Sequence, residues 1–311
     1  MPLHIFDLSN TNLFHRRALI RAANAINDST PNDQNFLIVV GTRNMIKALP
    51  KTLFGDWKTI INIVGFGRLY SDYWIIGRFI FNFIVWFHDR TTARAFIVEH
   101  DVDKALLERF VRHPVFTTHG SGLDTEGFTR KRKAPSKIIQ IGYLSRFDDS
   151  KGSHEVLKAA KNLPDDRHLI IAGWDIKGER YSKKFVELAQ KKSNVTFLGR
   201  LHSRAEISQF FNRIDLFLSP SVREGGNISL QEAIWHGIPF LTTDAPGCRV
   251  LADMFGCPAL EMSDFGNAII NFDTNTIEIC MKKWDEKLQS FNTAHVEKEY
   301  KTILRDVLNL G

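Results

Sequence analysis

The stretch SPSVREGGNISLQEAIWHGIPFLTTDAPGC, residues 219–248, decides the fold. The short apolar run LFLS at 216–219, which ends at the first residue of this stretch, predicts a buried strand, and the polar, glycine-rich residues 221–227 predict a tight loop. A helical pattern follows at 228–235. Glu224 and Glu232 therefore lie on either side of a turn that opens onto a helix. The backbone N–H groups at the start of a helix favour an anion such as a diphosphate.

This turn has two interpretations. In the first, Gly225 and Gly226 leave the backbone free to approach a ligand. In the second, the segment is an ordinary strand, loop and helix, and Ser229 and Glu232, three residues apart, form a capping box. The turn alone does not decide between them.

A second strand exit lies upstream. Residues 137–145, KIIQIGYLS, have the composition of a strand, and a helical pattern follows at 154–162. Arg146 and Lys151 lie between the two. Because ligands of parallel α/β sheets collect at the carboxyl ends of strands, these cations are expected to face the same crevice as the Glu224 loop and to neutralise a diphosphate there. The alternative for either residue is an ordinary solvated charge.

Several segments together resemble the C-terminal half of a GT-B glycosyltransferase of family GT4, over roughly residues 90–260. Within the family, the chain is similar to bacterial enzymes that extend undecaprenyl-diphosphate-linked oligosaccharides for O-antigen, capsule or glycoprotein glycans. The spacing of two glutamates with seven residues between them, followed by Ala and then Gly-Ile-Pro, is specific only in combination. The matching segments are GSGLDTEGF, SRFDDSKG, HLIIAGW, NVTFLGRL and IDLFLSPSVREGGNISLQEAIWHGIPFLTTDAPGC.

The resemblance implies roles for individual residues. It places Arg146 and Lys151 on the donor diphosphate, Glu224 on hydroxyls of the donor sugar, and Glu232 on the ribose. The resemblance implies two further sets of donor contacts. Backbone amides of the turn at 225–228 would bind the phosphates, and the loop after NVTFLG would contact the nucleobase. These are Gly225, Gly226, Asn227 and Ile228 for the turn, and Arg200 and Leu201 for the nucleobase.

The reaction implied is that of a retaining hexosyltransferase that needs no metal and no cofactor. The donor is a nucleotide sugar, with UDP favoured by resemblance, and the acceptor is a polyprenyl-diphosphate-linked or other glycan. No covalent nucleophile is evident, so the acceptor hydroxyl is expected to attack on the face from which the nucleotide leaves. Two alternatives stay open: a degenerate GT-B protein that binds nucleotide or partner enzymes without catalysis, and a GT-B sugar-nucleotide 2-epimerase.

The chain also departs from the family pattern. Ser145 stands where relatives usually have Gly before the phosphate-binding Arg, and Gly226 and Asn227 stand where they often have Phe-Gly or Pro. The region before about residue 133 is shorter than the usual Rossmann-like half. Some of the acceptor-side machinery is therefore expected to be missing or rebuilt.

Length and composition fit two α/β domains. The 311 residues are 43% hydrophobic and 24% charged, as in ordinary globular proteins. The expected fold is GT-B, with two Rossmann-like domains that have parallel sheets and an abbreviated N-terminal domain. The expected boundaries are 1–134 for the acceptor-side domain, 135–290 for the nucleotide-sugar domain and 291–311 for a C-terminal helix packing back on the first domain. The polar segment 120–128 and the basic segment 129–135 after it, which ends in a proline, form the expected linker.

A membrane surface is the other expected partner. The net charge is +6 and the pI about 9.2, which favours anionic partners, and nothing resembles a nucleic-acid module. Residues 70–87, YSDYWIIGRFIFNFIVWF, are too short and interrupted for a confident transmembrane helix. With the cations around them, residues 70–90 suit the headgroup layer of an anionic leaflet; the alternative is a buried helix. Without a secretory signal, the protein is expected in the cytoplasm, peripheral on the inner face of the cell membrane.

Two further patterns favour structural roles. The DVD at 101–103 begins a helical pattern, where acidic residues suit the first turn, so it is not expected to bind a metal. The three cysteines, Cys248, Cys257 and Cys280, have neither CxxC spacing nor paired histidines. They indicate no disulfide framework and no zinc site.

Overall fold

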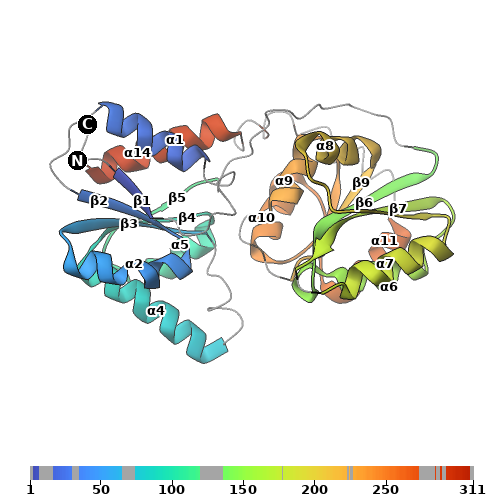
Figure 1. Cartoon of the computed structure of the whole chain (residues 1–311), viewed down its shortest axis with the longest axis horizontal. Coiled ribbons are helices and arrows are strands. Elements are labelled where there is room, and N and C mark those ends of the chain that lie inside the picture. Colours follow the sequence, from blue (N-terminus) through green and yellow to red (C-terminus); the bar gives the residue numbers. More distant parts are fainter. Residues whose placement is uncertain are drawn as a thin grey trace. The chain divides into compact units, whose positions relative to one another are not determined.

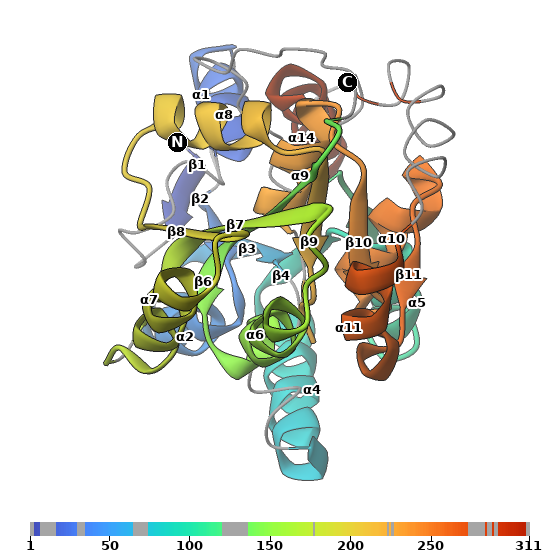
Figure 2. The same ribbon diagram turned by 90° about the vertical axis from the view of Figure 1, so that its right-hand side faces the viewer.

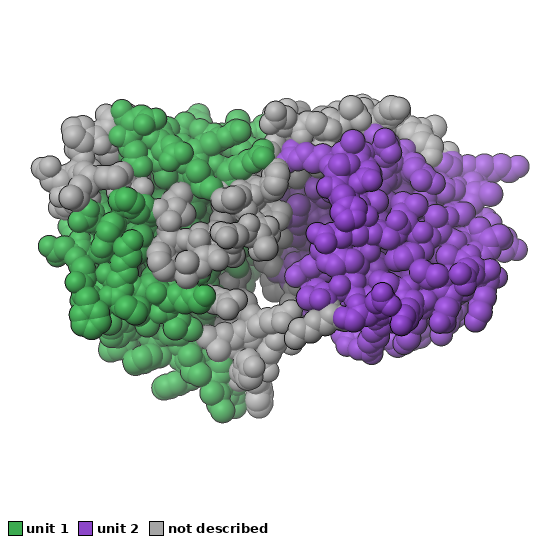
Figure 3. Space-filling view, viewed as in Figure 1, with its two compact units in different colours: residues 1–124, 290–311 green, residues 125–289 purple. Residues whose placement is uncertain are grey.

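Short apolar runs alternate with helices along the whole chain, and they assemble into two α/β units. The computed structural model describes residues 3–6, 17–29, 35–64, 74–119, 136–176, 178–222, 224, 227–272, 284, 288 and 292–308. Unit 1 comprises Met1–Asp124 and Ser290–Gly311, and unit 2 comprises Thr125–Gln289 (Figure 3). The expected boundary at 134/135 and the expected linker lie outside the described residues.

Unit 1 contains a five-stranded sheet in the order β1-β2-β3-β4-β5, with every pair parallel. The run NFLIVV of β2 is buried from its second residue onward, because both faces of the sheet are covered. The strands are β1 (Leu3–Phe6), β2 (Asn35–Val40), β3 (Trp57–Ile63), β4 (Ala93–Val98) and β5 (Val115–Thr117).

Helices cover both faces of this sheet (Figure 1). On one face, α1 (Arg17–Ser29) lies along α14 (Thr293–Leu308), and Leu19 and Leu304 share one core with β2. On the other face are α2 (Thr42–Phe54), α4 (Trp74–Thr91) and α5 (Asp101–Leu107). The last helix of the chain is therefore a structural part of unit 1.

Unit 2 contains a six-stranded parallel sheet in the order β11-β10-β9-β6-β7-β8. In Figure 2, α6, α7 and α11 lie on one face, and α8 and α9 lie on the other with α10. The strands are β6 (Ile139–Phe147), β7 (Arg167–Asp175), β8 (Val195–Gly199), β9 (Leu216–Ser219), β10 (Phe240–Thr243) and β11 (Ala259–Leu260). The helices are α6 (Ser153–Lys161), α7 (Arg180–Lys191), α8 (Arg204–Arg213), α9 (Ile228–Trp235), α10 (Pro246–Phe255) and α11 (Met262–Asn271).

The order of the second sheet creates a switch point. The chain starts this sheet at β6, builds outward through β7 and β8, and then returns to pair β9 with the free side of β6. The segments that leave β6 and β9 therefore run to helices on opposite faces, α6 and α9. In open α/β sheets, ligands bind in the crevice at the carboxyl ends of such strands.

The strand expected at 137–145 is β6, which lies two residues further along the chain, and the helix expected at 228–235 has the bounds of α9. The predicted helix at 70–87 is α4, shifted toward the C-terminus. No strand was predicted at the positions of β4 and β5. Cys248 and Cys257 are free and buried.

Candidate functional site

Lys151 and Glu224 meet at the switch point of unit 2. The Lys151 ammonium group forms an ion pair with Oε1 of Glu224, and only 14% and 12% of the two side chains are exposed. Ser221 Oγ donates a hydrogen bond to the same oxygen at 3.0 Å. The two opposite charges are mostly withdrawn from water, so each depends on the other for compensation. The sequence analysis expected these residues at one crevice, and the structure brings them together.

The exit from β6 is built to hold Lys151. Residues Asp149–Lys151 form a 3-10 turn whose cap is Asp148, and Asp148 Oδ1 accepts from the Lys151 N–H at 3.0 Å. The Tyr143 hydroxyl donates to the Lys151 carbonyl at 2.9 Å and lies 2.9 Å from Ser153 Oγ. Burial raises the pKa of Tyr143, which keeps the hydroxyl protonated as a donor. Hydrogen bonds thus hold both the N–H group and the carbonyl group of Lys151.

Gly152 locks the β6 exit against the β9 exit. Its φ of +66° lies in the left-handed region, and a Cβ there would lie 2.1 Å from the Pro220 carbonyl oxygen. Two residues further along the β9 exit, the Val222 N–H donates to the Ser150 carbonyl at 2.8 Å. Only glycine permits this approach, and the approach places Glu224 beside Lys151.

Asn227 caps α9 with its side chain. Oδ1 accepts from the Leu230 N–H at 3.1 Å, while Nδ2 donates to Ser219 Oγ at 2.6 Å and to Cys248 Sγ at 3.4 Å. The amide of Asn227 is therefore fully engaged inside the unit. The alternative capping box of Ser229 and Glu232 is wrong, because Ser229 lies inside the helix.

The start of α9 keeps the character of an anion site. The helix begins at Ile228, and the N–H groups of a first turn have no carbonyl one turn earlier to bond. The cap takes up the Leu230 N–H, and the Gln231 N–H bonds the Asn227 carbonyl. Gly225 and Gly226, expected in this turn, lie outside the described residues.

Glu232 has a different environment from Glu224. It lies half-buried on α9, and burial raises the pKa of its carboxyl to about 8, against an opposing effect of the Arg204 charge. Its carboxyl is thus largely protonated at neutral pH and can both donate and accept a hydrogen bond. The two glutamates of the motif therefore bring one ion-paired carboxylate and one neutral carboxyl group to the same loop and helix.

The carboxyl end of β7 adds an aromatic residue. Trp174 pairs in register with Arg146, and the Arg200 guanidinium lies 4.4 Å from the centroid of the Trp174 ring. Arg146 and Arg200 are exposed, and Leu201 is half-buried. Among the described residues, no hydrogen bond or ion pair joins Arg146 to Lys151 or Glu224. Trp174 was not predicted as a site residue, although its place at the carboxyl end of the strand HLIIAGW could have indicated one.

The sequence of unit 2 matches a known family. Residues 124–276 match the model described as glycosyl transferases group 1. Protein CapJ of Staphylococcus aureus is 34% identical over 113 residues, which are 35% of this chain and 28% of that protein. The putative colanic acid biosynthesis glycosyltransferase WcaL of Escherichia coli is 28% identical over 205 residues, 59% of this chain and 49% of that protein. The chain spans about half the length, or less, of such curated relatives.

The fold of the whole chain also has solved counterparts. Anabaena Alr3699/HepE, in a complex with UDP and glucose, superposes with a TM-score of 0.74 and 16% identity, covering 98% of this chain and 100% of that one. Sucrose-phosphate synthase of Thermosynechococcus elongatus gives a TM-score of 0.72 at 15% identity, covering 98% and 81%. At these identities the likeness concerns the fold, with its two parallel α/β units.

Proposed function

Since the chain belongs, through residues 124–276, to the group 1 glycosyl transferases and has a GT-B fold, we propose that it is a retaining hexosyltransferase. The donor is a UDP-sugar. The acceptor is a polyprenyl-diphosphate-linked glycan of cell-surface polysaccharide synthesis. WcaL, a putative colanic acid biosynthesis glycosyltransferase, supports the choice of pathway class, and HepE, solved with UDP and glucose, supports the choice of nucleotide.

The observation that carries the proposal is the Lys151–Glu224 ion pair. The pair lies at the switch point of the sheet of unit 2, where ligands bind in open α/β sheets. Lys151 follows β6, and Glu224 lies on the loop that leads into the first turn of α9. In the proposal, the donor diphosphate replaces the Glu224 carboxylate as the counter-ion of Lys151. Glu224 then turns to accept hydrogen bonds from hydroxyls of the donor sugar. The pair is therefore a resting arrangement that donor binding opens.

The transfer step needs stabilisation of the leaving diphosphate. The acceptor hydroxyl attacks the anomeric carbon on the face from which UDP departs; the bond to the diphosphate oxygen breaks with its electron pair, and the hydroxyl proton passes to that oxygen. Lys151, Arg146 and the first turn of α9 stabilise the negative charge that develops there. Preorganised charges of this kind act without reorganising during the reaction.

The remaining contacts concern the nucleoside. A protonated Glu232 is suited to the ribose, because its carboxyl can donate to one hydroxyl and accept from the other. Since the Asn227 side chain is engaged in capping, Asn227 and Ile228 would meet the phosphates through backbone N–H groups, together with Gly225 and Gly226. Arg200 and Leu201 are proposed for the nucleobase, beside Trp174.

Helix α4 is the proposed contact with an anionic membrane surface. One face of α4, with Phe81 and Val85, is buried in unit 1. The alternative of a buried helix is therefore correct for this face only. The other face exposes apolar side chains in a helical stripe. These are Ile75, Ile76, Phe79, Ile80, Phe83 and Trp86, between 40% and 75% exposed. Arg78 is also exposed on this helix, which suits phosphate headgroups. No described helix is both long and apolar enough to cross a bilayer.

Calorimetric titration with UDP, GDP and dTDP tests the donor site. We expect selective binding of UDP, and a loss of about tenfold or more in affinity for Lys151→Ala, since a hydrogen bond between charged groups contributes about 1.5–3 kcal/mol. The matched control is Lys158→Ala. Lys158 is exposed on α6, the helix that follows Lys151, and this variant should bind UDP like the wild type.

The outcomes separate the alternatives. Glu224→Ala is expected to keep UDP binding and lose turnover of a UDP-hexose, because its proposed contact is with the sugar. UDP binding without turnover in the wild type, across a screen of UDP-hexoses and lipid-linked acceptors, would favour the degenerate nucleotide-binding protein. An absence of binding to all three nucleotides would contradict the proposal.

A further inference from the structure

Unit 1 contains a cluster of two histidines and a glutamate that the proposed transfer does not use. His119 follows β5, while His295 and Glu299 lie four residues apart on α14, and the candidate ligand atoms of all three lie within 4.8 Å of one another. Among the residues that the structure describes, no other such group of His, Cys, Asp and Glu occurs.

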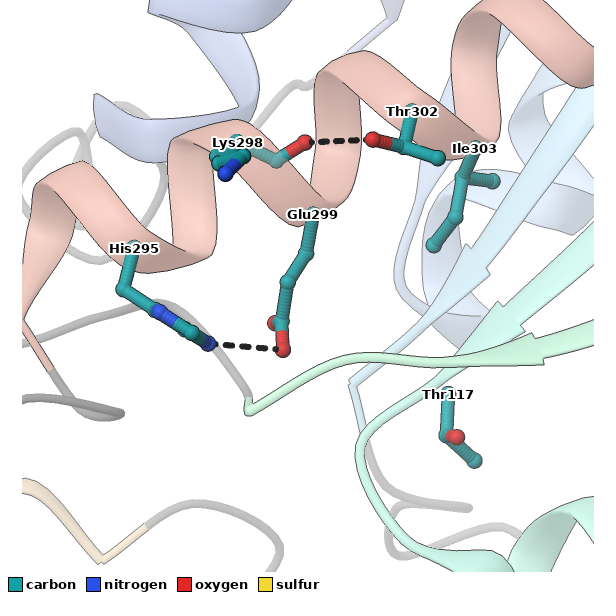
Figure 4. Close-up of a pocket in the computed structure, with 6 residues that line it drawn as sticks. All are labelled: Thr117, His295, Lys298, Glu299, Thr302 and Ile303. Carbon is teal, nitrogen blue, oxygen red and sulfur yellow. Dashed lines mark hydrogen bonds and ion pairs between the residues drawn. The ribbon is translucent and has the colours of Figure 1, made fainter. Parts of the chain in front are cut away.

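The glutamate is oriented by the backbone. Glu299 Oε2 accepts from the His119 N–H at 3.0 Å, which fixes the carboxylate and turns Oε1 toward both imidazole rings. Oε1 lies 2.6 Å from His119 Nδ1 and 3.4 Å from His295 Nε2. Figure 4 shows His295 and Glu299 pointing toward one another from the same side of α14. Two nitrogen donors and one oxygen donor thus converge from two separate elements.

One of the three spacings in the cluster already suits a transition metal. Zinc binds histidine nitrogen and carboxylate oxygen at about 2.0–2.2 Å, so the ligands of a tetrahedral site lie about 3.3 Å apart. The separation of 3.4 Å between His295 and Glu299 meets this value. The hydrogen bond of 2.6 Å between His119 and Glu299 would lengthen when the metal replaces the proton.

The cluster is accessible from outside. The side chains of His119, His295 and Glu299 are 37%, 44% and 22% exposed. An open pocket of about 340 Å³ adjoins the cluster, with room for a water or another fourth ligand (Figure 4). It is lined by Thr117, His295, Lys298, Glu299, Thr302 and Ile303.

We propose that His119, His295 and Glu299 form a binding site for a divalent transition metal of the zinc type, which links α14 to the carboxyl end of β5. His119 lies 176 residues before His295 and 180 before Glu299, so the site would join the two stretches of unit 1. The metal would hold the C-terminal helix on the sheet, and its binding would stabilise the folded unit by mass action. The site belongs to unit 1 alone and does not depend on the donor proposed above.

The test is titration of the full chain, without a polyhistidine tag and after removal of metals, with Zn²⁺ by calorimetry and with Co²⁺ by visible absorption. We expect one equivalent of metal to bind. The absorption spectrum of bound Co²⁺ should be that of a four-coordinate ion, and the unfolding temperature of the protein should rise when zinc is added. His295→Ala should weaken binding at least tenfold and abolish the rise. Its side chain is 44% exposed, so the fold should persist, as circular dichroism would establish.

The chain offers a matched control. His202 and Glu206 are also four residues apart, and the Glu206 carboxylate accepts from the His202 N–H at 2.7 Å, but no second imidazole joins them among the described residues. His202→Ala should leave zinc affinity unchanged. The proposal is overturned if the wild type binds no zinc beyond nonspecific levels, or if His295→Ala and His202→Ala behave alike.

Discussion

Glu232 carries a carboxyl group that burial keeps protonated near neutral pH. Its pKa of about 8 lies above the ordinary value of 4.5, so the unfolded chain loses this proton at lower pH than the folded chain does. Between these values the folded state holds a proton that the unfolded state has released. This group therefore makes the protein less stable as the pH rises from about 4.5 to 8.

Glu232→Gln should remove that pH dependence. The amide is neutral and nearly isosteric, so the gain in unfolding free energy over the wild type should grow with pH through this window, by at most about 1.4 kcal/mol per pH unit. Urea unfolding at several pH values measures it. Glu187→Gln, at an exposed position on α7, is the control and should follow the wild type. Parallel profiles for Glu232→Gln and the wild type would contradict the pKa shift.

Sequence predicts such residues unequally. Lys151 and Glu224 each follow a recognisable strand, so the topology alone brings them together. The capping role of Asn227 was missed, although an Asn directly before a predicted helix is a recognised capping signal. Its further bonds to Ser219 and Cys248 could not be predicted, because these residues reach the same point from other elements. Likewise, the perturbed Glu232 depends on burial against neighbours that no local pattern specifies.

The contact between the β6 and β9 exits rests on one glycine. Gly152 and Gly256 have nearly the same backbone conformation, with φ of +66° and +68°, but only Gly152 faces a close neighbour. A side chain at Gly256 would meet nothing within 4 Å, whereas one at Gly152 would meet Pro220. Comparing substitutions at these two glycines therefore distinguishes the cost of backbone strain from the cost of a steric clash.

Gly256→Ala should cost about 1–2 kcal/mol of stability, the usual cost of a left-handed non-glycine residue. Gly152→Ala should cost more, because the Pro220 backbone must also move, and it should weaken UDP binding since Lys151 precedes it directly. Denaturant unfolding and calorimetry give the two readouts. Equal costs for both variants, with unchanged UDP affinity, would show that the contact with Pro220 does not hold the site.

The elements themselves were predictable where their pattern is strong. The strands β6 and β9 are apolar runs that end in polar turns, and both were predicted at these places in the sequence. In unit 1, β5 has only three residues, too few for a periodicity, and β4 directly follows the long apolar helix α4, so their boundary has no turn signal.

For the molecule as a whole, α4 presents the main exposed apolar surface among the described residues. The opposite face of this helix is already buried, and no described residue of unit 1 covers the stripe. An anionic leaflet fits it, because the stripe includes Phe83 and Trp86 and the same helix carries Arg78 and Arg90.

Ile75→Ser with Ile76→Ser should reduce partitioning onto vesicles that contain phosphatidylglycerol by at least about tenfold, since each buried isoleucine contributes about 1.5 kcal/mol or more. The residues are 66% and 70% exposed, so stability should hardly change. Sedimentation with vesicles measures the effect, and Ile138→Ser, 48% exposed in unit 2, is the control. Equal partitioning would contradict the proposal. A wild-type dimer that the variant loses would assign the stripe to a second copy.

The return of α14 to unit 1 fixes an order of events during synthesis. Val296, Tyr300 and Leu304 complete the core that begins with α1, so this core cannot close until the last helix has left the ribosome. Unit 2 is one continuous stretch, Thr125–Gln289, and can fold while the chain is still being translated. The segment with α1 and β2 is therefore made before unit 2 but buried after it, and the nascent chain must keep the apolar faces of α1 and β2 from aggregation until α14 is made.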